Sequence, residues 1–173
     1  NSVSLVTSCW FVTQTEFQVT VGNRVSGSYL DTQIADGSYE RFRESPPPRE
    51  FDANGTFSID TSSFPLAYVD GVEISLRYAV SDIGERWFLM AFNWTSKTYS
   101  NNGFNSTSGH APSSGWNSYA VSLTDLWRSY VNDQGRIIVR VRDQGPDSTR
   151  TNINIDYPAA RKILKGEVYI FSN

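Results

Sequence analysis

Few residues of this chain could do nucleophilic or acid–base chemistry. The 173 residues include one histidine, His110, and one cysteine, Cys9. Hydrolases of the serine or cysteine type pair their nucleophile with a base, usually a histidine. His110 lies in a polar stretch, where we expect an exposed loop side chain, and Cys9 lies on the apolar side of an alternating segment, where we expect an inert buried thiol. A glycosidase needs two catalytic carboxylates, and no pair in an apolar setting stands out in this sequence. The sequence therefore predicts that the protein is not an enzyme.

A second group of residues is suited to binding a sugar. Aromatic residues make up 14% of the chain, and several flank a loop over residues 95–114 that is rich in Asn, Ser, Gly and Thr. An aromatic ring beside amide donors can hold a sugar ring. The alternative is that at least one tryptophan pins the loop to the body of the fold. The candidate glycan-binding residues are Trp94, Tyr99, Phe104 and Trp116.

Three Asn-x-Ser/Thr sequons are potential glycosylation sites. They begin at Asn54, Asn93 and Asn105. So short a pattern also arises by chance in a chain rich in Asn, Ser and Thr. Asn105 lies in the most loop-like stretch and is the strongest of the three.

Charge and hydropathy exclude two classes of partner. The formal net charge is -3, which does not suit nucleic acid, because that partner needs a basic surface. No apolar run approaches the roughly 20 residues of a membrane-spanning helix. The chain begins at Asn1 without an initiator Met and carries a single cysteine, and both features suit a secreted or cell-surface protein.

Alternating apolar and polar residues predict strands along most of the chain. The first alternation, over residues 3–21, forms one long strand or two. A clean alternation over 72–80 predicts a strand with one buried face, and 86–94, apolar on both faces, predicts a central strand. Thr124 is the expected N-cap of a single helical turn over 124–127. Further strands are expected at 39–44, 56–60, 118–123, 137–142, 152–157 and 167–171, which gives about eight to ten strands with turns between them.

Four sequence blocks carry a resemblance to a known family. They are Asp36-Gly37-Ser38-Tyr39, the strand that follows Gly115-Trp116, residues 130–142, and Ile155-Asp156-Tyr157. Together they resemble the galactose-binding-like jelly-roll β-sandwiches of secreted and surface proteins, many of which are carbohydrate-binding modules. The resemblance implies an all-β fold with two antiparallel sheets and an extracellular setting. Because one fold serves many functions, it does not by itself assign one.

The resemblance also implies a structural calcium ion at the edge of the sandwich. The oxygen ligands that would suit it are Asp31, Asp36 and Asp156. The alternative is that Asp36-Gly37 is a turn and that Asp156 faces outward and pairs with an arginine. No other cofactor is expected.

The beginning of the chain indicates self-assembly. An apolar strand starts almost at the first residue, and its assembly face consists of Val3, Leu5, Thr7, Cys9 and Phe11. Such a strand can complete the sheet of a neighbouring subunit, and open-ended donation produces a filament. The alternative is that residues 3–21 form the first strand of their own sandwich.

The sequence therefore predicts one β-sandwich domain over residues 1–173, with residues 1–21 as an extended strand that pairs with a neighbouring copy. The leading hypothesis is a non-enzymatic, exported filament or sheath subunit whose partners are copies of itself. The alternative is a carbohydrate-binding module whose partners are glycans.

Overall fold

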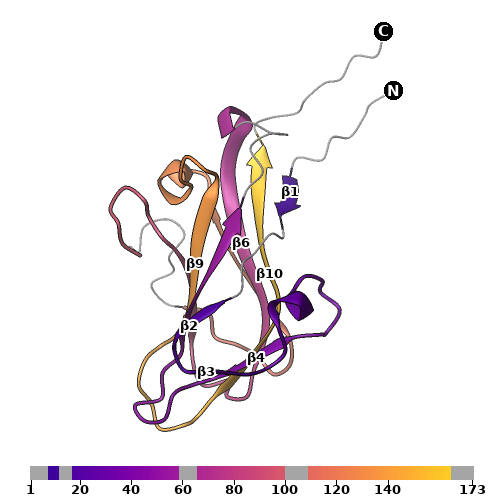
Figure 1. Cartoon of the computed structure of the whole chain (residues 1–173), viewed down its shortest axis with the longest axis vertical. Coiled ribbons are helices and arrows are strands. Elements are labelled where there is room, and N and C mark those ends of the chain that lie inside the picture. The colour runs from indigo at the N-terminus through magenta and orange to yellow at the C-terminus, as the bar shows by residue number, and fades with distance from the viewer. Residues whose placement is uncertain (1–7, 12–16, 59–65, 100–108, 165–173) are drawn as a thin grey trace.

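The computed structural model describes residues 8–11, 17–58, 66–99 and 109–164, and within these ranges ten strands form two antiparallel sheets (Figure 1). This confirms the predicted jelly-roll sandwich of about eight to ten strands. The six-stranded sheet has the order β3 (Asn23–Ser26), β4 (Glu40–Arg43), β10 (Asn152–Leu164), β6 (Val69–Val80) and β8 (Asn117–Leu123), with β1 (Ser8–Phe11) also paired to β10. The four-stranded sheet has the order β2 (Gln18–Val21), β5 (Asp52–Ser58), β9 (Arg136–Asp143) and β7 (Trp87–Ala91).

Alternation of residue type determines which face of each strand is buried. In β6, Ile74, Leu76 and Tyr78 face the core, whereas Arg77 points away from it. In the opposite sheet β9 buries Ile137, Val139 and Val141. Aromatic rings fill the space between the sheets, and consecutive pairs of Phe42, Phe51, Trp87 and Tyr78 have centroids 5.5 to 6.3 Å apart. The core consists of side chains from both sheets, and the outward side chains remain available for a site.

The first alternation of the sequence becomes two strands in different sheets. β1 pairs with β10 of the same chain, from Ser8↔Ile163 to Phe11↔Ala160, whereas β2 pairs with β5. Gly22, with φ of 96°, then carries the chain to β3 in the other sheet. A Cβ atom at Gly22 would lie 2.6 Å from the carbonyl oxygen of Arg43. The described part of the predicted donor strand is therefore paired within its own chain, and Val3, Leu5 and Thr7 lie outside the described residues.

The prediction that residues 86–94 form a central strand is wrong. β7 is at the edge of its sheet and pairs there with β9 alone. The segment is apolar on both faces because its outer face is also covered: Met90 is only 6% exposed although it points away from the core. On the free edge of β7, two backbone hydrogen bonds of 2.9 and 2.7 Å join Trp87 to His110.

Two smaller predictions also require correction. The helical turn lies at η3 (Trp127–Tyr130), three residues later than expected, and follows Leu126 in the left-handed region with φ of 58°. Asp156 does not face outward into solvent: a β-bulge between Ile155 and Tyr157 interrupts the alternation of β10, and Asp156 is fully buried. Two further 3₁₀ helices are η1 (Tyr29–Thr32) and η2 (Leu66–Tyr68). Among the described residues, none of the helices has the length and apolar character needed to cross a membrane.

Candidate functional site

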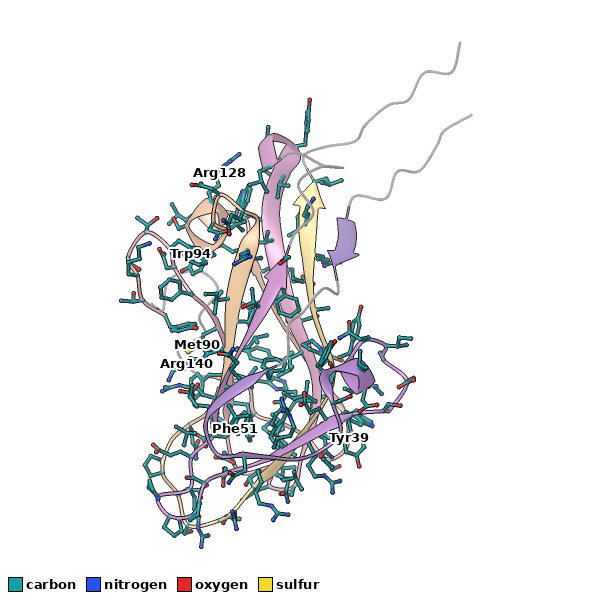
Figure 2. All side chains as sticks on the ribbon, in the orientation of Figure 1. Tyr39, Phe51, Met90, Trp94, Arg128 and Arg140 are labelled. Atoms are coloured by element: carbon teal, nitrogen blue, oxygen red, sulfur yellow. The ribbon has the colours of Figure 1, made fainter. Side chains whose placement is uncertain are left out.

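The outer face of the four-stranded sheet collects half-exposed aromatic and polar side chains. Alternate residues of β5, β9 and β7 point away from the core because their sequence neighbours are buried. The turn that follows β7 adds further aromatic rings. Figure 2 shows Met90, Trp94 and Arg140 on this side of the molecule and Tyr39 on the other. We call this surface the aromatic face, and it consists of Asp52, Asn54, Phe92, Trp94, Lys97, Tyr99 and Arg140.

Phe92 lies at the centre of the aromatic part of this face. Its ring meets that of Trp94 edge-on at 5.2 Å between centroids, and that of Tyr99 at 5.4 Å. Both are favourable arrangements for aromatic pairs. The Lys97 ammonium lies 5.7 Å from the centroid of the Trp94 ring. The three rings are therefore contiguous and partly solvent-accessible, with the Phe92 ring steeply inclined to both of its neighbours.

A turn held by Asn93 brings Tyr99 back beside Phe92. The buried Asn93 amide oxygen accepts hydrogen bonds from the backbone N–H groups of Thr95 (2.9 Å) and Ser96 (3.0 Å). Asn93 and Thr98 then form a β-bridge. Asn side chains commonly stabilise turns in this way. Local turn chemistry therefore places two rings seven residues apart on the same surface.

The polar part of the aromatic face is held by an ion pair and a hydrogen bond. Arg140 Nε donates to Asp52 Oδ1 at 2.8 Å, and a second guanidinium nitrogen donates to Asp52 Oδ2. The guanidinium lies 5.3 Å from the centroid of Tyr99, whose hydroxyl donates to Asn54 Oδ1 at 2.8 Å. The hydrogen bond that Arg140 donates to Asp52 raises the pKa of Arg140, and burial raises the pKa of Tyr99. Arg140 therefore stays charged and Tyr99 stays protonated through neutral pH.

Trp116, predicted with Trp94 and Tyr99, lies on the other sheet. Its ring is 37% exposed, lies 4.8 Å from the Arg77 guanidinium carbon, and meets the Tyr39 ring at 5.8 Å. Arg41, beside Tyr39, donates to Asn154 Oδ1 at 2.9 Å. We call this second surface the basic face, and it consists of Tyr39, Arg41, Arg77, Trp116 and Asn154. Of the four predicted aromatic residues, the structure thus groups Trp94 with Tyr99, separates Trp116 from them, and leaves Phe104 outside the described ranges.

Sequence reasoning missed Phe92, Arg140 and Asp52 as members of the aromatic face. The outward position of Arg140 was readable from the alternation of its strand. Its bonds to Asp52 depend on the register Asn54↔Arg140 between β5 and β9, which the sequence does not reveal. The backbone N–H of Trp94 donates to the carbonyl of Ser129 at 2.6 Å, which ties this turn to η3; the alternative that the Trp94 ring pins the loop stays a prediction.

The sequons have different surroundings. Asn54 is half-buried in the middle of β5 and accepts the Tyr99 hydrogen bond. Asn93 is only 8% exposed and stabilises its turn. Asn105 lies outside the described residues. Glycan attachment at these positions stays a prediction.

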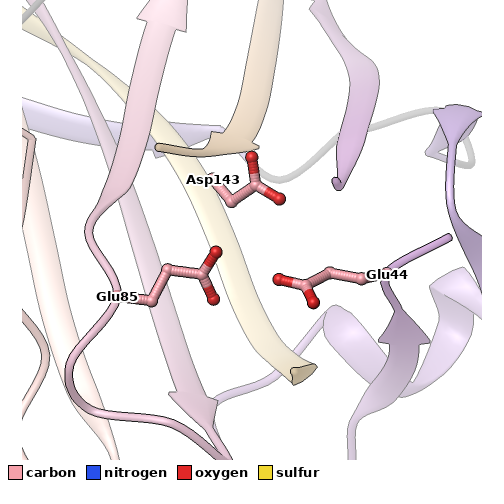
Figure 3. A group of neighbouring side chains, drawn as sticks. All are labelled: Glu44, Glu85 and Asp143. Atoms are coloured by element: carbon pink, nitrogen blue, oxygen red, sulfur yellow. The ribbon is translucent and has the colours of Figure 1, made fainter. Parts of the chain in front are cut away.

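The three aspartates predicted to bind calcium do not gather into one set. Asp31 accepts a hydrogen bond from the Ser28 N–H at 2.8 Å, and Asp36 accepts one from the Ser38 N–H at 2.8 Å. The Ser38 hydrogen bond, helped by Arg77, lowers the pKa of Asp36. Asp156 is buried and forms an ion pair with Arg77, as in the alternative. Within the described ranges, one group of three acidic side chains has oxygens within 4.8 Å of one another, and it is Glu44, Glu85 and Asp143 (Figure 3).

His110 is not the exposed loop residue that the sequence predicted. Its ring stacks on Tyr119 at 4.8 Å, and its Nδ1 lies 2.6 Å from the Tyr78 hydroxyl. Burial lowers the pKa of His110. The neighbours of His110 in the fold are thus aromatic side chains of the six-stranded sheet rather than a nucleophile.

The two packed antiparallel sheets define a jelly-roll β-sandwich. The chain belongs to the family of N-terminal glycosyl-hydrolase-114-associated domains, whose model matches residues 30–157.

Several solved structures are similar to this chain at very low sequence identity. The glycoside hydrolase domain of Endo-D from Streptococcus pneumoniae R6 matches with a TM-score of 0.50 and 9% identity over 89% of this chain. The match spans only 22% of that longer chain. The carbohydrate-binding module CBM4 gives a TM-score of 0.48 at 8% identity, covering 75% of this chain and 87% of its own. The mannan-recognising carbohydrate-binding module TmCBM27 gives a TM-score of 0.42 at 8% identity, and the match covers 89% of this chain and 98% of that module. Comparison with curated proteins gave no match.

Proposed function

We propose that this chain is a non-catalytic carbohydrate-binding module and that it binds glycan on the aromatic face. The observation that carries the proposal is the contiguous group of the Phe92, Trp94 and Tyr99 rings beside the Arg140–Asp52 pair. Membership of a family of domains associated with glycosyl hydrolases supports the same function.

The aromatic face offers the two kinds of contact that a sugar ring needs. The C–H groups of a pyranose pack against an aromatic ring, and its hydroxyls exchange hydrogen bonds with polar groups at the edge of that ring. Tyr99 supplies the ring, while Asn54 and the Arg140–Asp52 pair supply donors and acceptors around it. Each contact contributes about 1 kcal/mol, so that affinity depends on several of them acting together.

The charge of the aromatic face favours a neutral glycan. Asp52 neutralises Arg140 through two hydrogen bonds, and Lys97 contributes one exposed positive charge at the margin. An acidic polysaccharide would be bound better by arginines without a carboxylate partner. The fixed orientation of Arg140 reduces the side-chain entropy lost on binding.

The biological role we infer is that of an extracellular accessory to a glycoside hydrolase. A module that holds an enzyme on its polymeric substrate raises the local concentration of cleavable bonds without adding a catalytic group. The aromatic face suits this non-catalytic role, because its one carboxylate, Asp52, is engaged by Arg140 and does not form a glycosidase pair.

Self-assembly by strand donation has less support. Ser8–Phe11, the described part of the predicted donor strand, is paired with β10 of its own chain. This pairing fits the alternative that residues 3–21 belong to the sandwich of their own chain.

A glycan array followed by calorimetric titration of the strongest ligand tests the proposal. We expect Tyr99→Ala to abolish measurable binding, because it removes both the ring and the hydrogen bond to Asn54. The matched control is Trp116→Ala, which removes a half-exposed aromatic residue from the basic face and should bind like the wild type. Equal melting temperatures of the two variants exclude unfolding as the cause. Absence of binding to every neutral glycan would refute the function, and loss of binding in Trp116→Ala alone would refute the site.

A further inference from the structure

Three acidic side chains from distant parts of the sequence converge inside the sandwich (Figure 3). Glu44 follows β4, Glu85 precedes β7, and Asp143 is the last residue of β9. They are 0%, 1% and 3% exposed, and one oxygen from each lies within 4.8 Å of the others. We call this group the carboxylate cluster.

Backbone donors fix two of the three carboxylates. Glu44 Oε2 accepts the Thr151 N–H at 2.7 Å. The two oxygens of Asp143 accept the N–H groups of Phe51 and Gly145. These bonds hold both side chains in place while the charge in the centre of the cluster remains unneutralised.

The remaining polar atoms of the cluster lack hydrogen-bond partners. Both carboxylate oxygens of Glu85 are buried and unpartnered, as is Glu44 Oε1. The hydroxyl of Thr151, whose N–H already binds Glu44, is also buried and unpartnered. Buried polar atoms are nearly always satisfied in native proteins, so a proton shared between neighbouring groups, a water molecule or a cation has to satisfy these four oxygens.

Burial and mutual repulsion penalise the ionised cluster. Together they raise the pKa of Glu85 to about 9 and that of Asp143 to about 7. Burial also raises the pKa of Glu44, although the Thr151 hydrogen bond opposes the shift. The cluster therefore either holds protons at neutral pH or binds a cation that replaces them.

We propose that Glu44, Glu85 and Asp143 bind a Ca²⁺ ion, with the Thr151 hydroxyl as a further oxygen ligand. Carboxylates and a hydroxyl are hard oxygen donors of the kind that Ca²⁺ prefers. Two oxygens that share a Ca²⁺ at about 2.3–2.6 Å lie at most about 5.2 Å apart, which the cluster satisfies. Zn²⁺ favours nitrogen and sulfur ligands, and Mg²⁺ retains waters for which a buried cage has little room.

The bound ion would join the ends of three segments of the sandwich. Because the cluster is buried and built from other residues than the aromatic face, we infer that calcium stabilises the fold rather than contacting glycan. The inference is independent of the proposed function, and either can fail without the other.

Thermal unfolding of the full chain tests the site with metals alone. After treatment with a chelator, CaCl2 at millimolar concentration should raise the melting temperature by several degrees in a saturable manner, and MgCl2 should raise it much less. Tb³⁺ should give emission sensitised through Trp87, two residues from Glu85, and Ca²⁺ should displace it. An unchanged melting temperature together with no displaceable Tb³⁺ signal would overturn the proposal.

Isosteric variants identify the ligands. Glu85→Gln keeps the shape but removes one charge, so it should lose most of the calcium-induced shift and weaken Ca²⁺ binding at least about 10-fold. Its melting temperature without metal at neutral pH should equal or exceed that of the wild type, because folding of the wild type has to protonate Glu85 and the amide needs no proton. Glu44→Gln is a second variant with the same expectation. The control is Asp36→Asn, at one of the aspartates that the sequence alone suggested as a calcium ligand, and it should keep the full calcium-induced rise in melting temperature. A full rise in both glutamine variants would overturn the assignment of the ligands.

Discussion

The aromatic face and the carboxylate cluster treat charge in opposite ways within one sandwich. On the aromatic face, Asp52 and Arg140 neutralise each other where both remain partly exposed. In the cluster, three acidic groups lie together in the interior, and both oxygens of Glu85 lack a hydrogen-bond partner. The aromatic face thus presents a neutralised polar surface, whereas the cluster must take up protons or a cation before the fold reaches its full stability.

The largest effect that separates the two regions should be the pH dependence of unfolding in the presence of chelator. The folded-state pKa values, about 9 for Glu85 and about 7 for Asp143, lie above the values near 4 expected in the unfolded chain. The folded protein therefore binds more protons than the unfolded one, and stability that is fully present near pH 4 is lost as pH rises through 7 and 9. We expect a loss on the order of several kcal/mol, measured by urea denaturation at successive pH values. A flat profile up to pH 9 would show that the cluster is not strained by its charge.

Truncation of a carboxylate should cost far more in the cluster than on the face. Asp143→Ala leaves the buried N–H of Phe51 and the part-buried N–H of Gly145 without an acceptor, which should lower the free energy of unfolding by about 2–4 kcal/mol. Asp52→Ala removes only one side of a partly exposed ion pair and should cost less than about 1 kcal/mol. Chemical denaturation of both variants at one pH measures the contrast, and equal costs would contradict it.

On the aromatic face, removal of a single hydroxyl should have a smaller and selective effect. Tyr99→Phe keeps the ring beside Phe92 but loses the hydrogen bond to Asn54. We expect glycan affinity to fall about 5-fold, which corresponds to about 1 kcal/mol, with little change in melting temperature. Titration calorimetry against the array-selected glycan measures the effect. Unchanged affinity would place the ligand away from the hydroxyl.

The smallest effect is expected at the margin of the aromatic face. Lys97 is exposed, and its ammonium lies 5.7 Å from the Trp94 ring centroid. Lys97→Ala should change glycan affinity by no more than about 2–3-fold, because exposed cation–π contacts contribute roughly 0.5 kcal/mol. A loss comparable to that of Tyr99→Ala would indicate that the ligand is acidic rather than neutral.

Strand positions could be predicted from the sequence because alternation is a local property. Ile74, Leu76 and Tyr78 are spaced two residues apart, and the structure buries all three. The pairing of strands is not a local property and was not predictable in the same way. The apolar character of both faces of β7 suggested the centre of a sheet, but β7 lies at the edge. The bulge at Asp156 likewise has no counterpart in the apolar pattern.

The two sites were only partly predictable. Trp94 and Tyr99 are close in sequence, and the turn held by Asn93 keeps them close in space. Glu44, Glu85 and Asp143 lie far apart in the sequence, with none of the regular spacing of a calcium-binding loop. They converge through strand register, in which β9 pairs Asp143 with Trp87. Clusters that depend on register between distant strands give no local sequence signal.

Nuclear magnetic resonance of the ¹⁵N-labelled chain, titrated with the array-selected glycan, tests most directly whether glycan binds the aromatic face. We expect amide shift changes to concentrate in residues 52–56, 92–99 and 138–142, the segments that carry the aromatic face. Shift changes concentrated in residues 39–41, 77 and 116–118 would instead place the ligand on the basic face and refute binding at the aromatic face.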